Sequence, residues 1–188
     1  MAAGDTLSSL TMIRTFIAVE LPSSLRQALA QVQAEARNRI ARELSPAMRL
    51  QWVRPEAIHL TLKFLGDIPE QQVDEIKSAA GSALCSVAPF SVEVAGLGVF
   101  PDLRAPRILW VGLSGGEGTA SALSHLAAMV ERSVEPLGYP PESRPFNPHL
   151  TLARIKEGSQ EVGRAWARIG LLDGDVRLGP WDVRSVSL

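Results

Sequence analysis

The sequence contains one cysteine, Cys85, among its 188 residues. A single thiol excludes an internal disulfide bond and a zinc site built on several cysteines. We therefore expect the protein to work in a reducing, cytoplasmic compartment. Cys85 lies in an Ala-rich helical stretch with no histidine near it in sequence, so we expect it to be a small core residue and not a nucleophile.

The chain also lacks the segments that take a protein into or across a membrane. Its apolar runs fall short of the roughly 18 residues that a membrane-spanning helix requires. Residues 1–13 lack the basic start and long apolar centre of a secretory signal. We interpret them as a flexible leader, with Met12 as a candidate natural start, and we expect no contact with a membrane.

The sequence has no excess of charge of either sign: it contains 19 Lys and Arg and 20 Asp and Glu. No global positive field attracts nucleic acid, so a phosphate ligand has to be held by a few local groups. The sequence also lacks an acidic cluster for Mg²⁺ and a phosphate loop of the G-x-x-x-x-G-K-[ST] type. We therefore expect neither a metal nor a cofactor.

What is present is a globular composition, with 46% hydrophobic and 21% charged residues. Apolar, β-prone runs predict strands at residues 14–21, 50–53, 58–66, 90–100, 106–113 and 149–156, and over most of 176–188. Helical spacing of apolar residues predicts helices at about 22–44, 69–86, 117–137 and 159–171. Strands alternate with helices, so we expect an α/β or α+β fold in which residues 14–188 form one domain.

The order of these elements indicates an internal duplication. A strand, a long helix, a loop, a second strand, a helix and a third strand follow one another twice. Arg14 and Arg107 lie in the first strand of each half, and they precede His59 and His149 by 45 and 42 residues. Two such halves are expected to pack about a pseudo-two-fold axis that places equivalent residues face to face.

The two copies of one tetrapeptide give the strongest signal. His59-Leu60-Thr61-Leu62 and His149-Leu150-Thr151-Leu152 stand at equivalent places in the two halves. Side chains alternate along a strand, so His and Thr share one face while the leucines share the other. The leucines can pack under helices, which leaves two imidazoles and two hydroxyls to line a common groove.

This set of groups suits the hydrolysis of a phosphodiester. Water attacks phosphorus in line, and the leaving oxygen departs on the opposite side, so a base and an acid are needed on opposite sides. Imidazole, with a pKa near 6.5, can take either role near neutral pH. Threonine hydroxyls can donate hydrogen bonds to the non-bridging oxygens, where negative charge accumulates.

Other readings of the histidines are weaker. A single histidine in a strand is more often structural, but a symmetric pair is not readily explained in that way. Two histidines without further ligands at suitable spacing make a poor zinc site, since zinc takes at least three protein ligands. The third histidine, His125, has no counterpart in the other half and is expected at the surface of a helix.

At these residues the sequence resembles the two-histidine (2H) phosphoesterase superfamily, defined by two H-x-T-x motifs. Within it the chain is similar to the RNA 2′,3′-cyclic phosphodiesterases, historically called bacterial 2′-5′ RNA ligases. The resemblance covers residues 14–188 and rests on RTFIAVELP (14–22), WVRPEAIHLTLKFLGDI (52–68), FPDLRAPRILWVGL (100–113) and FNPHLTLAR (146–154). It implies an α+β, bilobal fold, in which two pseudo-symmetric antiparallel sheets face a central cleft with helices outside. Members commonly continue beyond the last strand, whereas this sequence stops at Leu188, so we expect that either the second lobe is trimmed or the sequence is shortened.

The resemblance also implies roles for particular residues. It makes His59 the proton donor and His149 the proton acceptor, with Thr61 and Thr151 as phosphate ligands. An arginine that follows the second motif in the family corresponds to Arg154. Strict alternation would put Arg154 on the leucine face, so we expect the strand to bend or end there.

Three further side chains are candidates for the cleft. By alternation Lys63 shares the face of His59 and Thr61, so we expect it to reach the phosphate. Phe16 and Phe146 can line the cleft and stack a base, although core packing is the preferred reading of these two rings.

The expected activity is the hydrolysis of RNA or nucleoside 2′,3′-cyclic phosphate ends to 2′-phosphomonoesters, without a metal. The same histidines could instead join RNA ends through a 2′-5′ linkage or cleave 2′,5′-oligonucleotides. A module that binds RNA ends without catalysis is a further alternative, although such a module has no need for two acid–base groups. The expected partners are RNA ends or small cyclic nucleotides, and we expect a monomer.

Overall fold

Strands and helices alternate along residues 11–114 and 119–188, which are the residues that this computed structural model describes. The strands are β1 (Met12–Glu20), β2 (Arg49–Trp52), β3 (His59–Pro69), β4 (Phe90–Phe100), β5 (Ile108–Ser114), β6 (His149–Glu157) and β7 (Arg177–Val183). The helices are α1 (Ser23–Ile40), α2 (Val73–Leu84), α3 (Thr119–Val134) and α4 (Ser159–Arg168). Short 3-10 turns cover Pro55–Ala57, Glu70–Gln72, Glu135–Leu137 and Leu171–Asp173.

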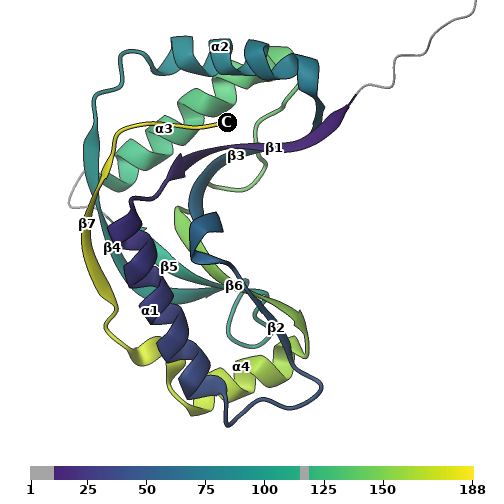
Figure 1. Ribbon diagram of the computed structural model, residues 1–188, viewed down its shortest axis with the longest axis vertical. Coiled ribbons are helices and arrows are strands. Elements are labelled where there is room, and N and C mark those ends of the chain that lie inside the picture. Colours follow the sequence, from purple (N-terminus) through teal and green to yellow (C-terminus); the bar gives the residue numbers. More distant parts are fainter. Residues whose placement is uncertain (1–10, 115–118) are drawn as a thin grey trace, which may run out of the picture.

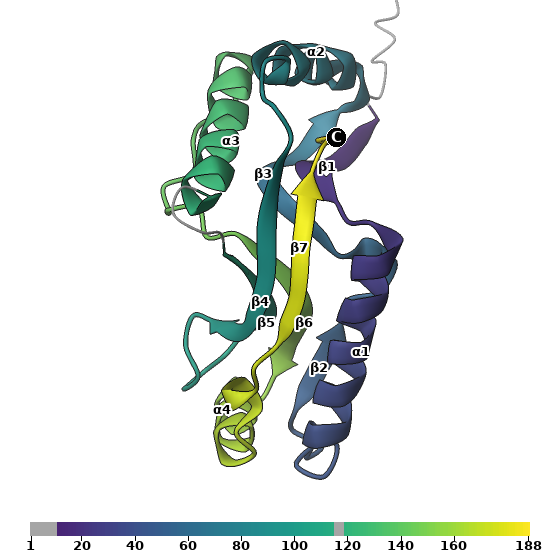
Figure 2. The same cartoon turned by 90° about the vertical axis from the view of Figure 1, so that its left-hand side faces the viewer.

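The strands of the described residues form two antiparallel sheets, which confirms the predicted α+β class. One sheet pairs β1 with β3, and the other has the order β2-β6-β5-β4-β7 (Figure 1). β4 and β7 run along much of the length of the molecule, from one lobe towards the other (Figure 2). Beyond β7, the backbone groups of Ser187 and Ala18 exchange hydrogen bonds of 2.8 and 2.9 Å, which ties the end of the larger sheet to the smaller one.

Helix α1 forms where the sequence places apolar residues at helical spacing after a proline. Pro22 precedes its first turn, and the side chains buried by the helix are Leu25, Leu29, Gln33, Ala36 and Ile40. The amide of buried Gln33 donates hydrogen bonds of 2.7 and 2.8 Å to the backbone oxygens of Val53 and Leu152. Helix α1 therefore packs on the face of the larger sheet that lies away from the histidines, and holds β6 beside the end of β2.

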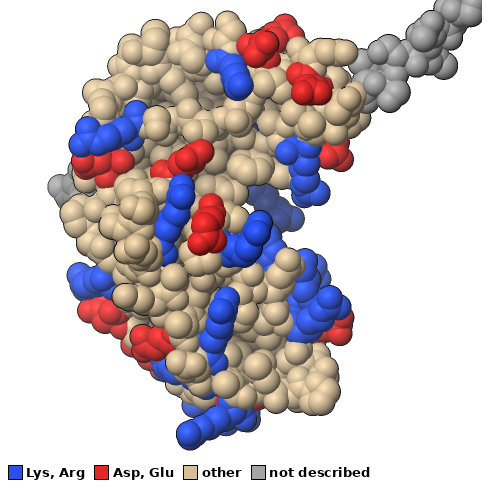
Figure 3. Space-filling model, in the orientation of Figure 1, with Lys and Arg blue, Asp and Glu red and all other residues tan. Residues whose placement is uncertain are grey.

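The helices lie on the outer faces of the two lobes, so the inner faces are left for the cleft. α2 and α3 pack together beside β3, while α1 and α4 belong to the other lobe (Figure 1). The buried leucines of both HLTL motifs belong to one hydrophobic core: Leu60, Leu62, Leu150 and Leu152. The molecular surface is hollowed between the lobes, with Lys and Arg side chains on both sides of the hollow (Figure 3).

Some predicted boundaries differ from the structure. Strand β1 begins at Met12, so the last two residues of the predicted leader, 1–13, are paired with β3, opposite Pro69 and Ile68. Residues 1–10 lie outside the described residues. Helix α1 ends at Ile40, four residues before the predicted end at Leu44. Among the described residues, none of the helices has the length and hydropathy needed to cross a membrane.

Candidate active site

The two histidines begin equivalent strands and are held in equivalent ways. His59 opens β3 and His149 opens β6. The Nδ1 atom of His149 lies 2.7 Å from the backbone oxygen of Asn147, two residues earlier. A carbonyl oxygen only accepts, so Nδ1 carries a proton and Nε2 is free for chemistry. The ring of His59 hydrogen-bonds the backbone of Ala57, which also lies two residues earlier.

Aromatic rings pack against each imidazole. The ring of Phe16, from β1, stacks on His59 with a centroid distance of 4.4 Å and an interplanar angle of 9°. The ring of Phe100, from β4, meets the ring of His149 edge-on with a centroid distance of 5.0 Å. The ring of Trp110, from β5, lies 6.4 Å from the His149 ring. Phe16 therefore lines the cleft against a histidine and is only half-buried, so core packing does not describe it.

Trp110 can occupy its place because a neighbouring strand provides room. Gly98 pairs with Trp110 in the larger sheet, and a Cβ atom at Gly98 would come within 2.2 Å of the indole ring. Glycine at this position thus allows the indole to lie flat across β4 towards Phe100, whose ring centroid is 5.1 Å away. Sequence reasoning missed Phe100 and Trp110. The signal that could have found Trp110 is its place in the apolar run 106–113, which β5 forms beside the second HLTL strand, with Phe100 one strand further away at the end of β4.

The environment lowers the pKa of both histidines. Burial is the main cause for His59, and the positive charge of Arg154 adds to it, while the Ala57 backbone and Glu20 oppose it. Burial also dominates at His149, where Arg154 again lowers the pKa and the Asn147 backbone raises it. The guanidinium of Arg154 thus acts on both imidazoles, which places one cation close to the two histidines.

A β-bulge brings Arg154 to the histidine face. The pairing of β6 with β5 passes from Thr151 to Ala153 and skips Leu152. Leu152 and Ala153 are both buried, and Arg154 is exposed. A bulge shifts the alternation by one residue, so Arg154 lies on the same face as His149 and Thr151. The expected bend of this strand is confirmed.

Strand β3 has the matching bulge, and it overturns the placement predicted for Lys63. The pairing of β3 with β1 passes from Thr61 to Lys63 and skips Leu62. Lys63 is therefore buried, with 3% exposure, on the side of the leucines, and the next residue, Phe64, takes the histidine face. The prediction that Lys63 shares the face of the histidine is wrong, because strict alternation does not hold across a bulge.

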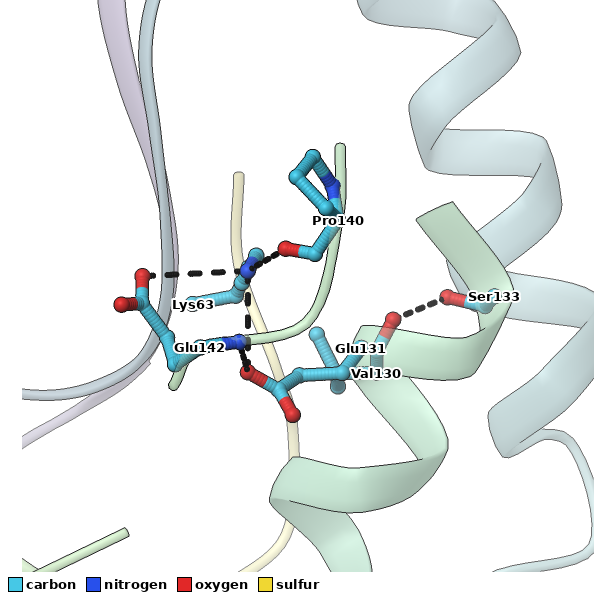
Figure 4. A network of polar contacts seen from close by, with 6 residues as sticks. All are labelled: Lys63, Val130, Glu131, Ser133, Pro140 and Glu142. Atoms are coloured by element: carbon cyan, nitrogen blue, oxygen red, sulfur yellow. Dashed lines mark hydrogen bonds and ion pairs between the residues drawn. The ribbon is translucent and has the colours of Figure 1, made fainter. Parts of the chain in front are cut away.

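The ammonium group of Lys63 is engaged within the structure instead. Its Nζ donates a hydrogen bond of 2.5 Å to the backbone oxygen of Pro140 and lies 3.6 and 3.7 Å from carboxylate oxygens of Glu131 and Glu142 (Figure 4). The backbone N–H of Glu142 donates to Glu131 at 2.9 Å (Figure 4). Lys63 thus fastens the segment that leads to His149 onto β3 and α3, and its ammonium group is turned away from the cleft.

The other residues named from the sequence differ in how far they are buried. Thr61 and Thr151 are half-buried, at the second position after each histidine on the cleft face. Phe146 is half-buried and packs against the core, as preferred from the sequence, and His125 is exposed on α3, as expected. Cys85 is exposed, so its predicted place in the core is wrong: α2 ends at Leu84 and leaves it outside. Within residues 11–114 and 119–188, no three His, Cys, Asp or Glu side chains converge into a metal site.

Comparisons with known proteins extend over most of the chain. The family model described as LigT like Phosphoesterase matches residues 19–110 and 116–171, which include both histidines. An RNA 2′,3′-cyclic phosphodiesterase of Methanothermobacter thermautotrophicus is 32% identical over 176 residues, or 94% of this chain and 88% of that protein. One of Aquifex aeolicus is 41% identical over 123 residues, or 65% of this chain and 64% of that protein.

Solved structures of similar fold also cover most of the chain. A crystal structure of a Thermus thermophilus protein is similar with a TM-score of 0.68 and 30% identity, covering 93% of this chain and 86% of that one. Escherichia coli LigT complexed with 3′-AMP has a TM-score of 0.62 at 23% identity, with 94% and 87% covered. Because the family model matches well over half of the chain, this protein belongs to the LigT-like phosphoesterase family.

Proposed function

We propose that His59 and His149 act as proton donor and proton acceptor in the reaction of this enzyme, the hydrolysis of RNA 2′,3′-cyclic phosphate ends to 2′-phosphomonoesters. The substrate class follows from the relatives, which are named RNA 2′,3′-cyclic phosphodiesterases and are 32% and 41% identical to this chain. The division of roles between the two histidines is our proposal for this chain.

In the proposed mechanism, His149 accepts a proton from the attacking water through its free Nε2. The water oxygen bonds to phosphorus as the bond from phosphorus to the 3′-oxygen breaks. His59 donates its proton to the departing 3′-oxygen, so the phosphate remains on the 2′-oxygen. Two imidazoles placed on opposite strands of the cleft suit this in-line geometry.

Three further side chains are proposed to hold the phosphate. The hydroxyls of Thr61 and Thr151 donate hydrogen bonds to the non-bridging oxygens, and Arg154 neutralises the charge that develops there. Arg154 supports this assignment because its charge acts on both histidines, so an anion beside it also lies near both. A bound phosphate anion would raise the pKa of His59 again and so favour the protonated form that an acid requires.

The observation that carries the proposal is the equivalence of the two histidines. Each opens a strand, hydrogen-bonds the backbone two residues earlier, and precedes a threonine and a bulge on one cleft face. A structural histidine would not need this arrangement twice. A module that only binds RNA ends would not need two imidazoles with one nitrogen left free.

The test measures hydrolysis of a nucleoside 2′,3′-cyclic phosphate in the presence of excess chelator and without ATP. We expect turnover to persist, and His59→Ala and His149→Ala each to lower kcat by at least about 10²-fold, as typical for the loss of a general acid or base. His125→Ala is the matched control, because His125 is exposed on α3. Activity that vanishes with chelator and returns with a divalent ion, or that survives both active-site variants, would contradict the mechanism.

We further propose that the enzyme works as a monomer in the cytoplasm. Both histidines, both threonines and Arg154 come from a single chain, so the site needs no second copy. The exposed thiol of Cys85 suits a reducing compartment. Light scattering of the purified protein and fractionation of cells test these two statements, and a stable dimer or an exported protein would contradict them.

A further inference from the structure

The cleft face of β3 carries an aromatic side chain that the reaction proposed above does not use. Phe64 is 43% exposed, although it is a large apolar residue. The bulge at Leu62 places it on the face of His59 and Thr61, and it pairs with Phe16, the residue that stacks on His59. Phe64 thus lies along the cleft from the histidine, at most roughly 10 Å beyond Thr61, which is three residues earlier in the strand.

A cation lies over this ring. The guanidinium carbon of Arg14 is 4.8 Å from the centroid of Phe64. Arg14 stands two residues before Phe16 in β1, so alternation puts both side chains on the cleft face. Arg14 is exposed. The face therefore offers a flat aromatic surface with a planar cation beside it, a combination that suits a base and a phosphate.

The two halves carry different side chains after their bulges. Phe64 and Arg154 follow equivalent bulges, and they pair with Phe16 and Ile108 in the neighbouring strands. The duplicated strands thus carry an aromatic ring at the position where the other half carries a guanidinium. Arg154 acts on both histidines and belongs to the reacting phosphate. The second cation, Arg14, lies farther along the cleft and is available to a different part of the substrate.

We propose that Arg14 and Phe64 form a subsite for the nucleotide that precedes the cyclic phosphate end of an RNA strand. The ring of Phe64 stacks on the base of that nucleotide. The guanidinium of Arg14 donates hydrogen bonds to the phosphodiester that joins that nucleotide to the terminal one. Stacking on an aromatic ring tolerates any base, so the subsite recognises an RNA strand and not a sequence. This inference rests on the proposed function, because it requires an RNA end in the cleft.

The experiment compares two substrates with the intact protein. One is a nucleoside 2′,3′-cyclic phosphate, and the other is a dinucleotide that ends in the same cyclic nucleotide. We expect the unmodified enzyme to favour the dinucleotide in kcat/KM by about tenfold or more, as one stacked base provides. Arg14→Ala and Phe64→Ala should each bring this ratio towards one, mainly through KM, and Phe64→Trp should keep it.

A matched control comes from a second pair of the same kind. The guanidinium carbon of Arg37, in α1, lies 4.8 Å from the ring of Trp52, in β2. Gln51 pairs directly with Arg154 and shares its face, so Trp52 points to the opposite side, towards α1. Arg37→Ala removes the same kind of contact outside the cleft and should leave the substrate ratio as it is in the unmodified enzyme.

A dinucleotide with a neutral methylphosphonate linkage separates the two roles. With this substrate Arg14→Ala should have little effect on the ratio, whereas Phe64→Ala should still lower it. A ratio near one in the unmodified enzyme, or a ratio unchanged in both variants, overturns the subsite. An equal loss on both substrates also overturns it, because the pair then serves the terminal nucleotide or the fold.

Failure of the proposed function gives a different result, namely no turnover of either substrate by the unmodified protein. In that case the binding of a mononucleotide and a dinucleotide 2′-phosphate decides the question by calorimetry. Tighter binding of the dinucleotide that depends on Arg14 and Phe64 supports the subsite, and equal binding of the two ligands overturns it.

Discussion

The two histidines have similar contacts but differ in the charged residues near them. The carboxylate of Glu20, which pairs with His59 in the β1–β3 ladder, raises the pKa of that histidine. The pKa of His149 is set by burial, the Asn147 backbone and Arg154. A neighbouring carboxylate favours the protonated imidazole, so His59 is better suited to hold a proton before the reaction begins. This asymmetry supports His59 as the donor and His149 as the acceptor.

The first prediction separates the two roles by changing the leaving group. Ribose alkoxide leaves poorly without a proton, whereas p-nitrophenolate leaves without one. His59→Ala should therefore lose far more activity on the cyclic ribose substrate than on a p-nitrophenyl phosphodiester. His149→Ala should lose activity on both, because each substrate needs its water deprotonated. The measurement is the rate of each variant on each substrate, relative to the unmodified enzyme.

The rescue of His59→Ala should be partial, because a protonated His59 also stabilises charge on the phosphoryl oxygens. Rescue of His149→Ala in its place would reverse the two assignments. If neither variant recovers on the p-nitrophenyl substrate, the histidines act mainly through electrostatics, and the division into acid and base is wrong.

Elements, and the bulges within them, decide which side chains reach the cleft. The ladder of β3 with β1 skips Leu62, and again Leu65, while the ladder of β6 with β5 skips Leu152. After the bulge the fourth residue beyond each histidine, Lys63 or Ala153, points to the helices, and the fifth, Phe64 or Arg154, points to the cleft. The bulge in β3 thus turns Lys63 into the interior, whereas the bulge in β6 turns Arg154 to the cleft face.

The second prediction compares these two cations. Lys63→Met should lower the free energy of unfolding by roughly 2 kcal/mol, because it removes the charged donor to Pro140 and leaves Glu131 and Glu142 facing each other. Arg154→Met should change stability little, since Arg154 is exposed, but should raise KM and lower kcat. Urea unfolding and steady-state kinetics on both variants provide the four measurements.

The folded fraction of Lys63→Met should retain a KM close to that of the unmodified enzyme. A large rise in KM for this variant without loss of stability would show that Lys63 binds the phosphate after all. Lys63→Arg keeps the charge and should recover part of the stability.

At the scale of the whole molecule, one hydrophobic core and the long strands β4 and β7 hold two lobes around a cleft that buries both imidazoles in part. Burial lowers the pKa of both histidines below the usual 6.5. The unfolded chain therefore binds more protons than the folded one near this pH. Partial burial of the two imidazoles thus makes the folded protein less stable in acid.

The third prediction concerns this pH dependence. Because the folded pKa values are lowered, the contribution of the histidines to stability is complete above about pH 6.5 and is lost as the pH falls through the folded values. The free energy of unfolding should thus decrease between pH 7.5 and pH 5.5. The double variant His59→Gln, His149→Gln should show a smaller decrease, with carboxylates responsible for the remainder. Urea unfolding at both pH values measures the two slopes, and identical slopes would contradict the pKa shifts.

The sequence by itself determined most strands and helices and the pair of histidines, and its resemblance to a known family selected α+β over α/β. A duplicated HLTL tetrapeptide is visible without any coordinates, and the alternation of side chains places its histidines and leucines on opposite faces. Only the tertiary structure decided which side chains after each motif face the cleft. Whether a strand skips a residue depends on its hydrogen bonds to the neighbouring strand. The residue types in KFLG (63–66) and ARIK (153–156) do not predict a bulge. The same reason applies to Phe16, Phe100 and Trp110, which contact the histidines from other strands of the two sheets and not along the chain.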